Sequence, residues 1–145
     1  MTTRILIMGL PGAGKTTLAL NLLSYFSPEV LWLNADEIRA KFDDWDFSAQ
    51  GRIRQSRRMR EIADVSNKDY IIADFVCPLQ EMRDIYDPDF LIWVDTIHES
   101  RFEDTNQLFV APEQYDVRVT EQDAGHWARI IYEQISHKIQ STPQR

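Results

Sequence analysis

The sequence contains a single cysteine, Cys77, among 145 residues. One thiol excludes an internal disulfide bond and a zinc site built on several cysteines. This usage predicts a protein of a reducing, cytoplasmic compartment. The three histidines, His98, His126 and His137, do not have the spacing of metal ligands, and we assign them no role.

Long apolar runs are absent as well. No stretch reaches the roughly 18 consecutive apolar residues of a membrane-spanning helix, so we expect no membrane span. Residues 1–4 run directly into a strand pattern and show neither the apolar core nor the cleavage site of a signal peptide. The length predicts one domain, residues 1–145, and a hydrophobic content of 43% is enough to bury a core.

Positive charge is scarce, since 16 basic residues stand against 23 acidic ones and the formal net charge is −7. This balance disfavours broad binding to nucleic acid. Residues 48–60 are an exception, because they hold five arginines and no acid. A local positive patch on an acidic protein suits a small anionic substrate, and the alternative is an ordinary solvated helix face.

Glycine is also rare, and three of the five glycines lie in residues 9–16. This segment reads G-L-P-G-A-G-K-T, a complete G-x-x-x-x-G-K-[ST] loop between an apolar run and a helical pattern. Its N–H groups are expected to converge on the β-phosphate of a nucleoside triphosphate. The predicted nucleotide-binding residues are Gly9, Pro11, Gly12, Ala13, Gly14, Lys15, Thr16 and Thr17.

Two side chains of the loop carry the chemistry. We expect Lys15 to reach the β- and γ-phosphates of ATP and to be exposed without nucleotide, and Thr16 to place its hydroxyl on Mg²⁺. The chain has no Asn/Thr-Lys-x-Asp guanine motif, which disfavours a GTPase of the common type. The small size favours phosphoryl transfer to a small acceptor.

Apolar runs alternate with helical patterns along the chain. This alternation predicts a three-layer α/β fold with a five-stranded, mostly parallel sheet that binds ligands beyond the carboxyl ends of its strands. The expected strands are 4–8, 30–33, 70–74, 90–94 and 117–119. The expected helices are 15–26, 36–42, 48–67, 79–85, 97–108 and 121–140.

The last expected helix has its own signals. Thr120 and Asp123 have the spacing of a capping box, and we expect residues 141–145 to fray. Five apolar residues recur at helical spacing, which predicts a core-facing stripe. The stripe consists of Trp127, Ile130, Ile131, Ile135 and Ile139.

A second polar segment, residues 34–39, follows the second expected strand. Asp36 would open a helix, where it can act as an N-cap or face the γ-phosphate. A carboxylate there can orient an acceptor hydroxyl, accept its proton or hold a Mg²⁺-bound water. Arg39 can fix an anionic acceptor through a forked contact. We therefore predict catalytic roles for Lys15, Asp36 and Arg39.

Asp74 ends the third expected strand, the position of a Walker-B carboxylate near Mg²⁺. Two roles are open for Asp74: it supports a metal ion, or it forms structural hydrogen bonds. The predicted metal ligands are Thr16, Asp36 and Asp74. Cys77 has no histidine near it in sequence, which favours a buried bystander over a nucleophile.

These motifs resemble the adenylylsulfate (APS) kinase family. Residues 9–17 reproduce its glycine loop, and residues 34–39 keep the second Asp and the Arg of its D-G-D-N-[VI]-R motif, with Asn34 replacing the first Asp. Residues 76–79 and 94–96 match its I-S-P-Y and V-D-T elements. The family usually has a small residue at the position of Asp74.

The arginine-rich segment adds to this resemblance. Residues 47–58 resemble F-S-x-x-D-R-x-x-N-I-R-R, with Gln55 replacing the Asn. The resemblance implies the strand order 2-3-1-4-5 and phosphorylation of the 3′-hydroxyl of APS, with Phe47 on the adenine and two arginines on the phosphosulfate. The implied acceptor-binding residues are Asp36, Arg39, Phe47, Arg52, Gln55, Cys77 and Pro78.

The resemblance weakens over residues 101–112, which are short, acidic and without the lysines of the family lid. Arg101 is the only cation there, so we expect incomplete closure, measurable hydrolysis of ATP without acceptor and slow turnover of APS. The alternative is a pocket rebuilt for another nucleotide, sugar or nucleic-acid hydroxyl. A nucleotide-binding regulator without turnover and a homodimer both remain open.

Overall fold

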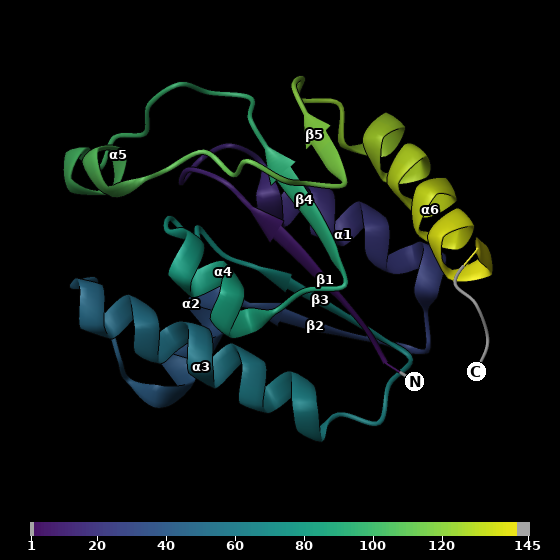
Figure 1. The fold of residues 1–145 in the computed structure, drawn as a ribbon, viewed down its shortest axis with the longest axis horizontal. Helices are drawn as coiled ribbons and strands as arrows, with labels where there is room; N and C mark the ends of the chain where they lie inside the picture. Colours follow the sequence, from purple (N-terminus) through teal and green to yellow (C-terminus); the bar gives the residue numbers. More distant parts are fainter. Residues whose placement is uncertain (1, 142–145) are drawn as a thin grey trace.

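The computed structural model describes residues 2–141 and confirms the expected α/β fold (Figure 1). Its strands form one parallel sheet in the order β2-β3-β1-β4-β5, as the resemblance implied. The strands are β1 (Thr3–Met8), β2 (Val30–Asn34), β3 (Tyr70–Asp74), β4 (Phe90–Val94) and β5 (Val117–Val119). The helices are α1 (Lys15–Phe26), α2 (Ala35–Phe42), α3 (Ala49–Val65), α4 (Gln80–Tyr86), α5 (Glu103–Leu108) and α6 (Ala124–Ser141).

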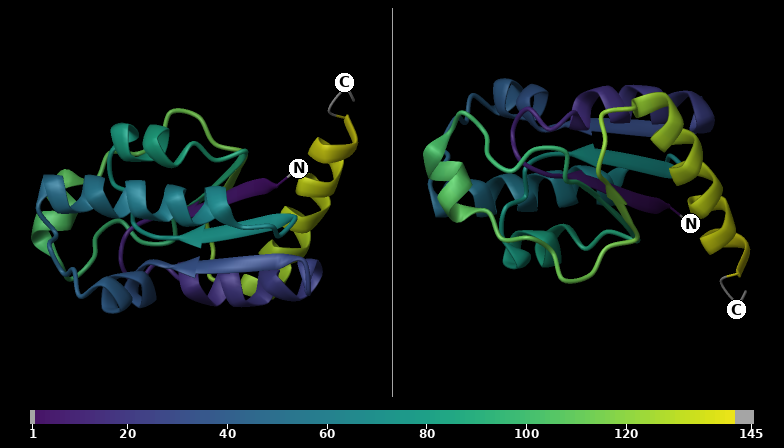
Figure 2. Two further views of the ribbon diagram at one scale, coloured as in Figure 1. Left: turned by 90° about the horizontal axis from the view of Figure 1, so that it is seen from below. Right: turned by 90° about the horizontal axis from the view of Figure 1, so that it is seen from above.

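The central strand β1 divides the core into two halves. Ile5 and Ile7 belong to a cluster shared with α1 and α6, whereas Leu6 and Met8 belong to a cluster shared with α3 and α4. All four side chains are buried, as expected for a strand covered on both faces. Figure 2 shows the sheet edge-on between these two helical layers.

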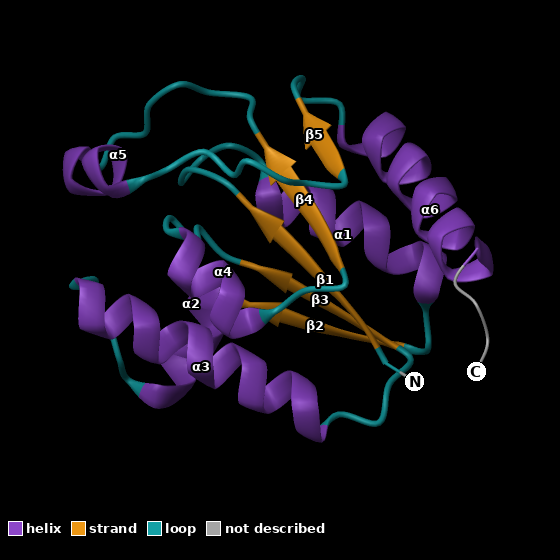
Figure 3. Ribbon diagram, in the orientation of Figure 1, coloured by secondary structure: helices purple, strands orange, loops and turns teal. Residues whose placement is uncertain are grey.

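Two expected helices differ from the structure. The helix expected over 97–108 is only α5, because Ser100 and Phe102 form a turn held by the Ser100 hydroxyl. The segment before α5 is therefore a loop (Figure 3). The last helix begins at Ala124, since the Asp123 carboxylate accepts the His126 N–H at 3.4 Å, so the Thr120 capping box is wrong.

The apolar stripe of α6 is confirmed in part. Ile131 and Ile135 are buried against α1 and the sheet, and Trp127 packs beside them. Ile139, however, is 42% exposed. Among the described helices none is long and apolar enough to cross a membrane. Residues 142–145, where we expected fraying, lie outside the described residues.

Candidate active site

The glycine loop connects β1 to α1 at the carboxyl edge of the sheet. Gly9 passes so close to β4 that a Cβ there would lie 2.5 Å from the carbonyl oxygen of Val94, and its φ is +154°. Only glycine suits this position. From the other side, the Thr96 hydroxyl donates to the Ala13 carbonyl at 2.6 Å. The glycine loop is therefore held in place by β4 and by the residues that follow this strand.

Lys15 folds back over the loop. Its ammonium group donates to the Leu10 carbonyl at 2.9 Å, and the residue is only 8% exposed. The expectation that Lys15 would be exposed is therefore wrong. Burial lowers the pKa of the Lys15 ammonium to about 8, against the opposing attraction of Asp74 and Asp36.

Asp74 is held at the end of β3 by two neighbours from β2. Its carboxylate accepts the Trp32 indole N–H at 3.0 Å and the Asn34 amide at 3.1 Å, and the Thr16 hydroxyl lies 3.5 Å from both of its oxygens. Burial raises the pKa of the Asp74 carboxyl, and hydrogen bonds from Asn34 and Trp32 oppose that shift.

These residues fit a magnesium ion. A carboxylate and a hydroxyl beside the glycine loop are hard oxygen donors of the kind that Mg²⁺ takes together with phosphates. Within residues 2–141 no group of three or more His, Cys, Asp or Glu is arranged to hold a metal by itself. Thr16 and Asp74 are the residues that would hold the ion.

Asn34 and Asp74 are two departures from the family pattern, and the structure places them together. They are register partners across β2 and β3. The family pattern has a carboxylate on β2 and a small residue on β3, whereas this chain has an amide on β2 and a carboxylate on β3. One carboxylate is therefore kept at this edge of the sheet, on the neighbouring strand.

Asp36 is not a cap. The N-cap of α2 is Asn34, whose side-chain oxygen accepts the Glu37 N–H at 3.1 Å. The cap interpretation of Asp36 is therefore wrong, because the helix begins one residue earlier than expected. Asp36 is exposed at the start of α2, and its carboxylate is free to face the cleft.

The glycine loop opens into a cleft of about 850 Å³. Lys15, Thr16, Asp36 and Asp74 line one side. A smaller cavity of about 60 Å³ adjoins it between α2, α3 and the segment after β3. That cavity is lined by all seven residues that the resemblance assigned to the acceptor: Asp36, Arg39, Phe47, Arg52, Gln55, Cys77 and Pro78.

Two arginines meet at Phe47. The Arg39 guanidinium lies 4.3 Å from the centre of the Phe47 ring and that of Arg52 lies 5.5 Å from it. Arg39 donates to the carbonyls of Asp44 and Asp46, and the pKa values of both guanidinium groups are lowered by burial. Neither guanidinium hydrogen-bonds a carboxylate within the described residues, so both keep charge for an anion.

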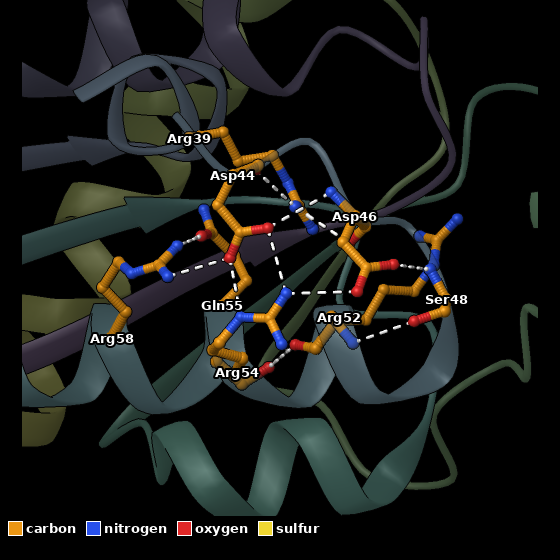
Figure 4. A network of polar contacts seen from close by, with 10 residues as sticks. Arg39, Asp44, Asp46, Ser48, Arg52, Arg54, Gln55 and Arg58 are labelled. Atoms are coloured by element: carbon orange, nitrogen blue, oxygen red, sulfur yellow. Dashed lines mark hydrogen bonds and ion pairs between the residues drawn. The ribbon is translucent and has the colours of Figure 1, made fainter. Parts of the chain in front are cut away.

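Three of the other four arginines of α3 are paired with acids, and Figure 4 shows two of them, Arg54 and Arg58. Arg54 and Arg58 both bind the Asp44 carboxylate, at 2.7 and 2.9 Å, and hold the pKa of that carboxyl far below its usual range. Arg60 pairs with Asp64 one turn later on the same helix. Arg57 is exposed on α3, so Arg52 is the one arginine of residues 48–60 that lines the cleft.

The loop before α3 packs tightly on that helix. A Cβ at Gly51 would overlap the carbonyl oxygen of Asp46. The family pattern has Asp at the position of Gly51, and a side chain there would not fit this path of the loop. It brings the Asp46 carbonyl to Arg39 and holds the loop that carries Phe47.

Gln55 and Cys77 have structural contacts. The Gln55 amide donates to the Ala35 carbonyl at 3.1 Å and accepts from Arg58, so it ties α3 to α2. Cys77 is buried, and burial raises the pKa of its thiol. A thiol that stays protonated is a poor nucleophile, which supports the bystander interpretation.

Residues 97–109, hereafter called the lid segment, contribute several side chains to the lining of the cleft. Arg101 lines the cleft with two acids, Glu99 and Asp104. The chain just beyond the lid segment is fixed to the acceptor side, because the Val110 N–H donates to the Pro78 carbonyl at 2.9 Å. Buried Arg83 donates to the carbonyls of both Pro78 and Val110.

Sequence reasoning missed Asn34, Trp32, Arg83 and Thr105. Asn34 gave the one available signal, since asparagine before a helical pattern is a common N-cap. The contacts of the other three join segments at least 5 and up to 53 residues apart and follow from the fold.

One of two sequence comparisons relates this chain to known proteins. A sequence profile described as adenylylsulphate kinase matches residues 1–111, about three quarters of the chain. A search of curated proteins finds no match.

Solved structures share the fold at low identity. The APS kinase CysC of Mycobacterium tuberculosis, solved with AMPPNP and APS, is 17% identical with a TM-score of 0.78, over 93% of this chain and 98% of that one. Shikimate kinase from Aquifex aeolicus vf5 is 13% identical with a TM-score of 0.68, over 97% and 100%. A gluconokinase from Sinorhizobium meliloti 1021 is 13% identical with a TM-score of 0.66, over 97% and 98%.

Proposed function

Since this chain belongs to the adenylylsulphate kinase family, we propose that it transfers the γ-phosphoryl group of Mg·ATP to the 3′-hydroxyl of adenosine 5′-phosphosulfate (APS). It is an ATP-dependent phosphotransferase that acts on a hydroxyl group. The observation that carries the choice of acceptor is the cavity beside the cleft, in which Arg39 and Arg52 meet at Phe47. Two cations and an aromatic ring suit an anionic nucleotide.

Each residue has a role in this reaction. Lys15 binds the β- and γ-phosphates, and the two arginines hold the phosphosulfate. The Asp36 carboxylate accepts the hydroxyl proton as the acceptor oxygen bonds to the γ-phosphorus and the bond to ADP breaks. Mg²⁺ held by Thr16 and Asp74 would neutralise charge on the phosphates. Catalysis is then mainly positioning and charge neutralisation.

A second acceptor class is supported by the acids of the lid segment. Glu99 and Asp104 line the same cleft and reduce its positive charge, which suits a less charged hydroxyl compound such as a sugar. The test is a screen of ADP release over APS, nucleosides, sugars and DNA ends. Stimulation by APS supports the first proposal, stimulation by a sugar supports the second, and stimulation by none of the four contradicts both.

The arginines at Phe47 give a prediction for the acceptor. Arg39→Ala and Arg52→Ala should each raise the KM for APS by about tenfold or more, because each removes a charge-assisted contact worth on the order of 1.5–3 kcal/mol. The KM for ATP should change little. Arg129→Ala on the exposed face of α6 is the control. An equal loss of ATP affinity would place these side chains on the nucleotide.

The lid segment gives a second prediction. Because Arg101 is its one cation at the cleft, ATP hydrolysis without acceptor should be measurable and APS turnover slow. Arg101→Ala should lower transfer by roughly 10-fold to 10³-fold, as expected when one stabilising charge is lost. Steady-state ADP release with and without APS measures both. Efficient APS turnover with negligible hydrolysis would contradict this account of the lid.

A further inference from the structure

One buried hydrogen bond joins the lid segment to the acceptor cavity. The Arg52 guanidinium donates through Nη2 to the Thr105 hydroxyl at 2.9 Å, and through Nε to the Phe47 carbonyl at 2.8 Å. Thr105 is 4% exposed and Arg52 is 7% exposed. Arg52 is therefore held by α5 on one side and by the loop of Phe47 on the other.

Hydrogen bonds within the lid segment also join Ser100 to Asn106. The Asn106 side-chain oxygen accepts the Ser100 N–H at 2.8 Å and the Ser100 hydroxyl at 2.7 Å, and its amide donates to the Ser100 carbonyl at 2.9 Å. Arg101 and Thr105 lie inside this ring of contacts. The contacts between Ser100 and Asn106 therefore set the position of Arg101. Thr105 attaches the same group of residues to Arg52.

We infer that Thr105 is a positioning residue that couples acceptor binding at Arg52 to the placement of Arg101 over the phosphates. The inference rests on the proposed function, since it takes Arg52 as an acceptor contact. An anion that fixes Arg52 also fixes the Thr105 hydroxyl, and with it the ring from Ser100 to Asn106. The lid segment then holds Arg101 in place at the cleft when the acceptor is bound.

Thr105→Val tests this coupling, because valine keeps the shape of threonine and removes only the hydroxyl. We expect the KM for APS to rise about tenfold, kcat to fall and the KM for ATP to stay within twofold. Thr105→Ser should restore both parameters to near wild type. Thr120→Val, at an exposed position, is the matched control. An unchanged KM for APS in Thr105→Val would overturn the inference.

Hydrogen exchange supplies a readout that needs no turnover. Amides of residues 99–109 should exchange about tenfold faster in Thr105→Val than in wild type, and APS should slow them in wild type only. If no acceptor stimulates wild-type ADP release, the proposed function falls and the coupling to an acceptor falls with it. Exchange then tests the structural half of the inference, that Thr105 holds the lid segment on Arg52: faster exchange in the variant supports it, and equal exchange overturns it.

Discussion

Replacing Lys15 with methionine is expected to lower kcat/KM for phosphoryl transfer by at least about 10²-fold, while raising the melting temperature at pH 7. Activity is lost because the ammonium group that would meet the β- and γ-phosphates is gone. Stability rises because the ammonium is buried, with its pKa lowered to about 8. Methionine fills the same space without a charge to desolvate.

The pH dependence separates these two effects. The pKa of Lys15 is about 8 in the folded chain and near 10.5 in the unfolded chain, so the cost of burying its charge is full below pH 8 and disappears between pH 8 and 10.5. The stability gap between Lys15→Met and wild type should close over that range.

Nucleotide binding should respond in the same pH range. Above pH 8 the free protein must take up a proton to bind ATP, so the affinity of wild type should fall by up to tenfold per pH unit. Calorimetry of ATP binding and thermal unfolding at several pH values measure both effects, with Lys41→Met, on the exposed face of α2, as the control. Retained turnover in Lys15→Met would remove the glycine loop from the mechanism.

Asp36→Asn is expected to lower kcat by roughly 10²-fold to 10⁴-fold, the usual range for loss of a general base. Asparagine keeps the size of the side chain and removes its charge. Because the cap of α2 is Asn34, the substitution should leave the melting temperature unchanged, and the KM for ATP should change far less than kcat.

Glu37→Gln is the matched control for this variant, since it removes a carboxylate from the next residue of the same exposed turn. It should retain wild-type kcat. Single-turnover kinetics with APS and ATP would separate chemistry from binding. A kcat for Asp36→Asn within threefold of wild type would show that the Asp36 carboxylate has no part in proton transfer.

The features that the sequence predicted correctly are local. The glycine loop, the alternation of strands and helices, and the placement of Asp36 and Arg39 on the same side of one helix all depend on spacing within a few residues. The strand order came from the family resemblance, and the structure confirms it. The roles assigned to individual site residues remain predictions, although all seven acceptor residues line one cavity.

Some of the missed features depend on the path of a loop, and others depend on contacts between distant segments. Nothing near Lys15 in sequence shows that its side chain folds back to Leu10, and nothing near Arg54 shows that Asp44 neutralises it. The Arg52–Thr105 contact spans 53 residues. The first two contacts depend on how a loop folds back, and the third arises only after the sheet has placed α3 and α5, so spacing rules reveal none of them.

The close packing of Gly51 against Asp46 has a consequence for engineering this sequence toward the family pattern. The family pattern has Asp where this chain has Gly51, and any side chain there would collide with the backbone of the preceding loop. The family residue therefore cannot be introduced at this position alone, because the loop that carries Phe47 would have to move with it.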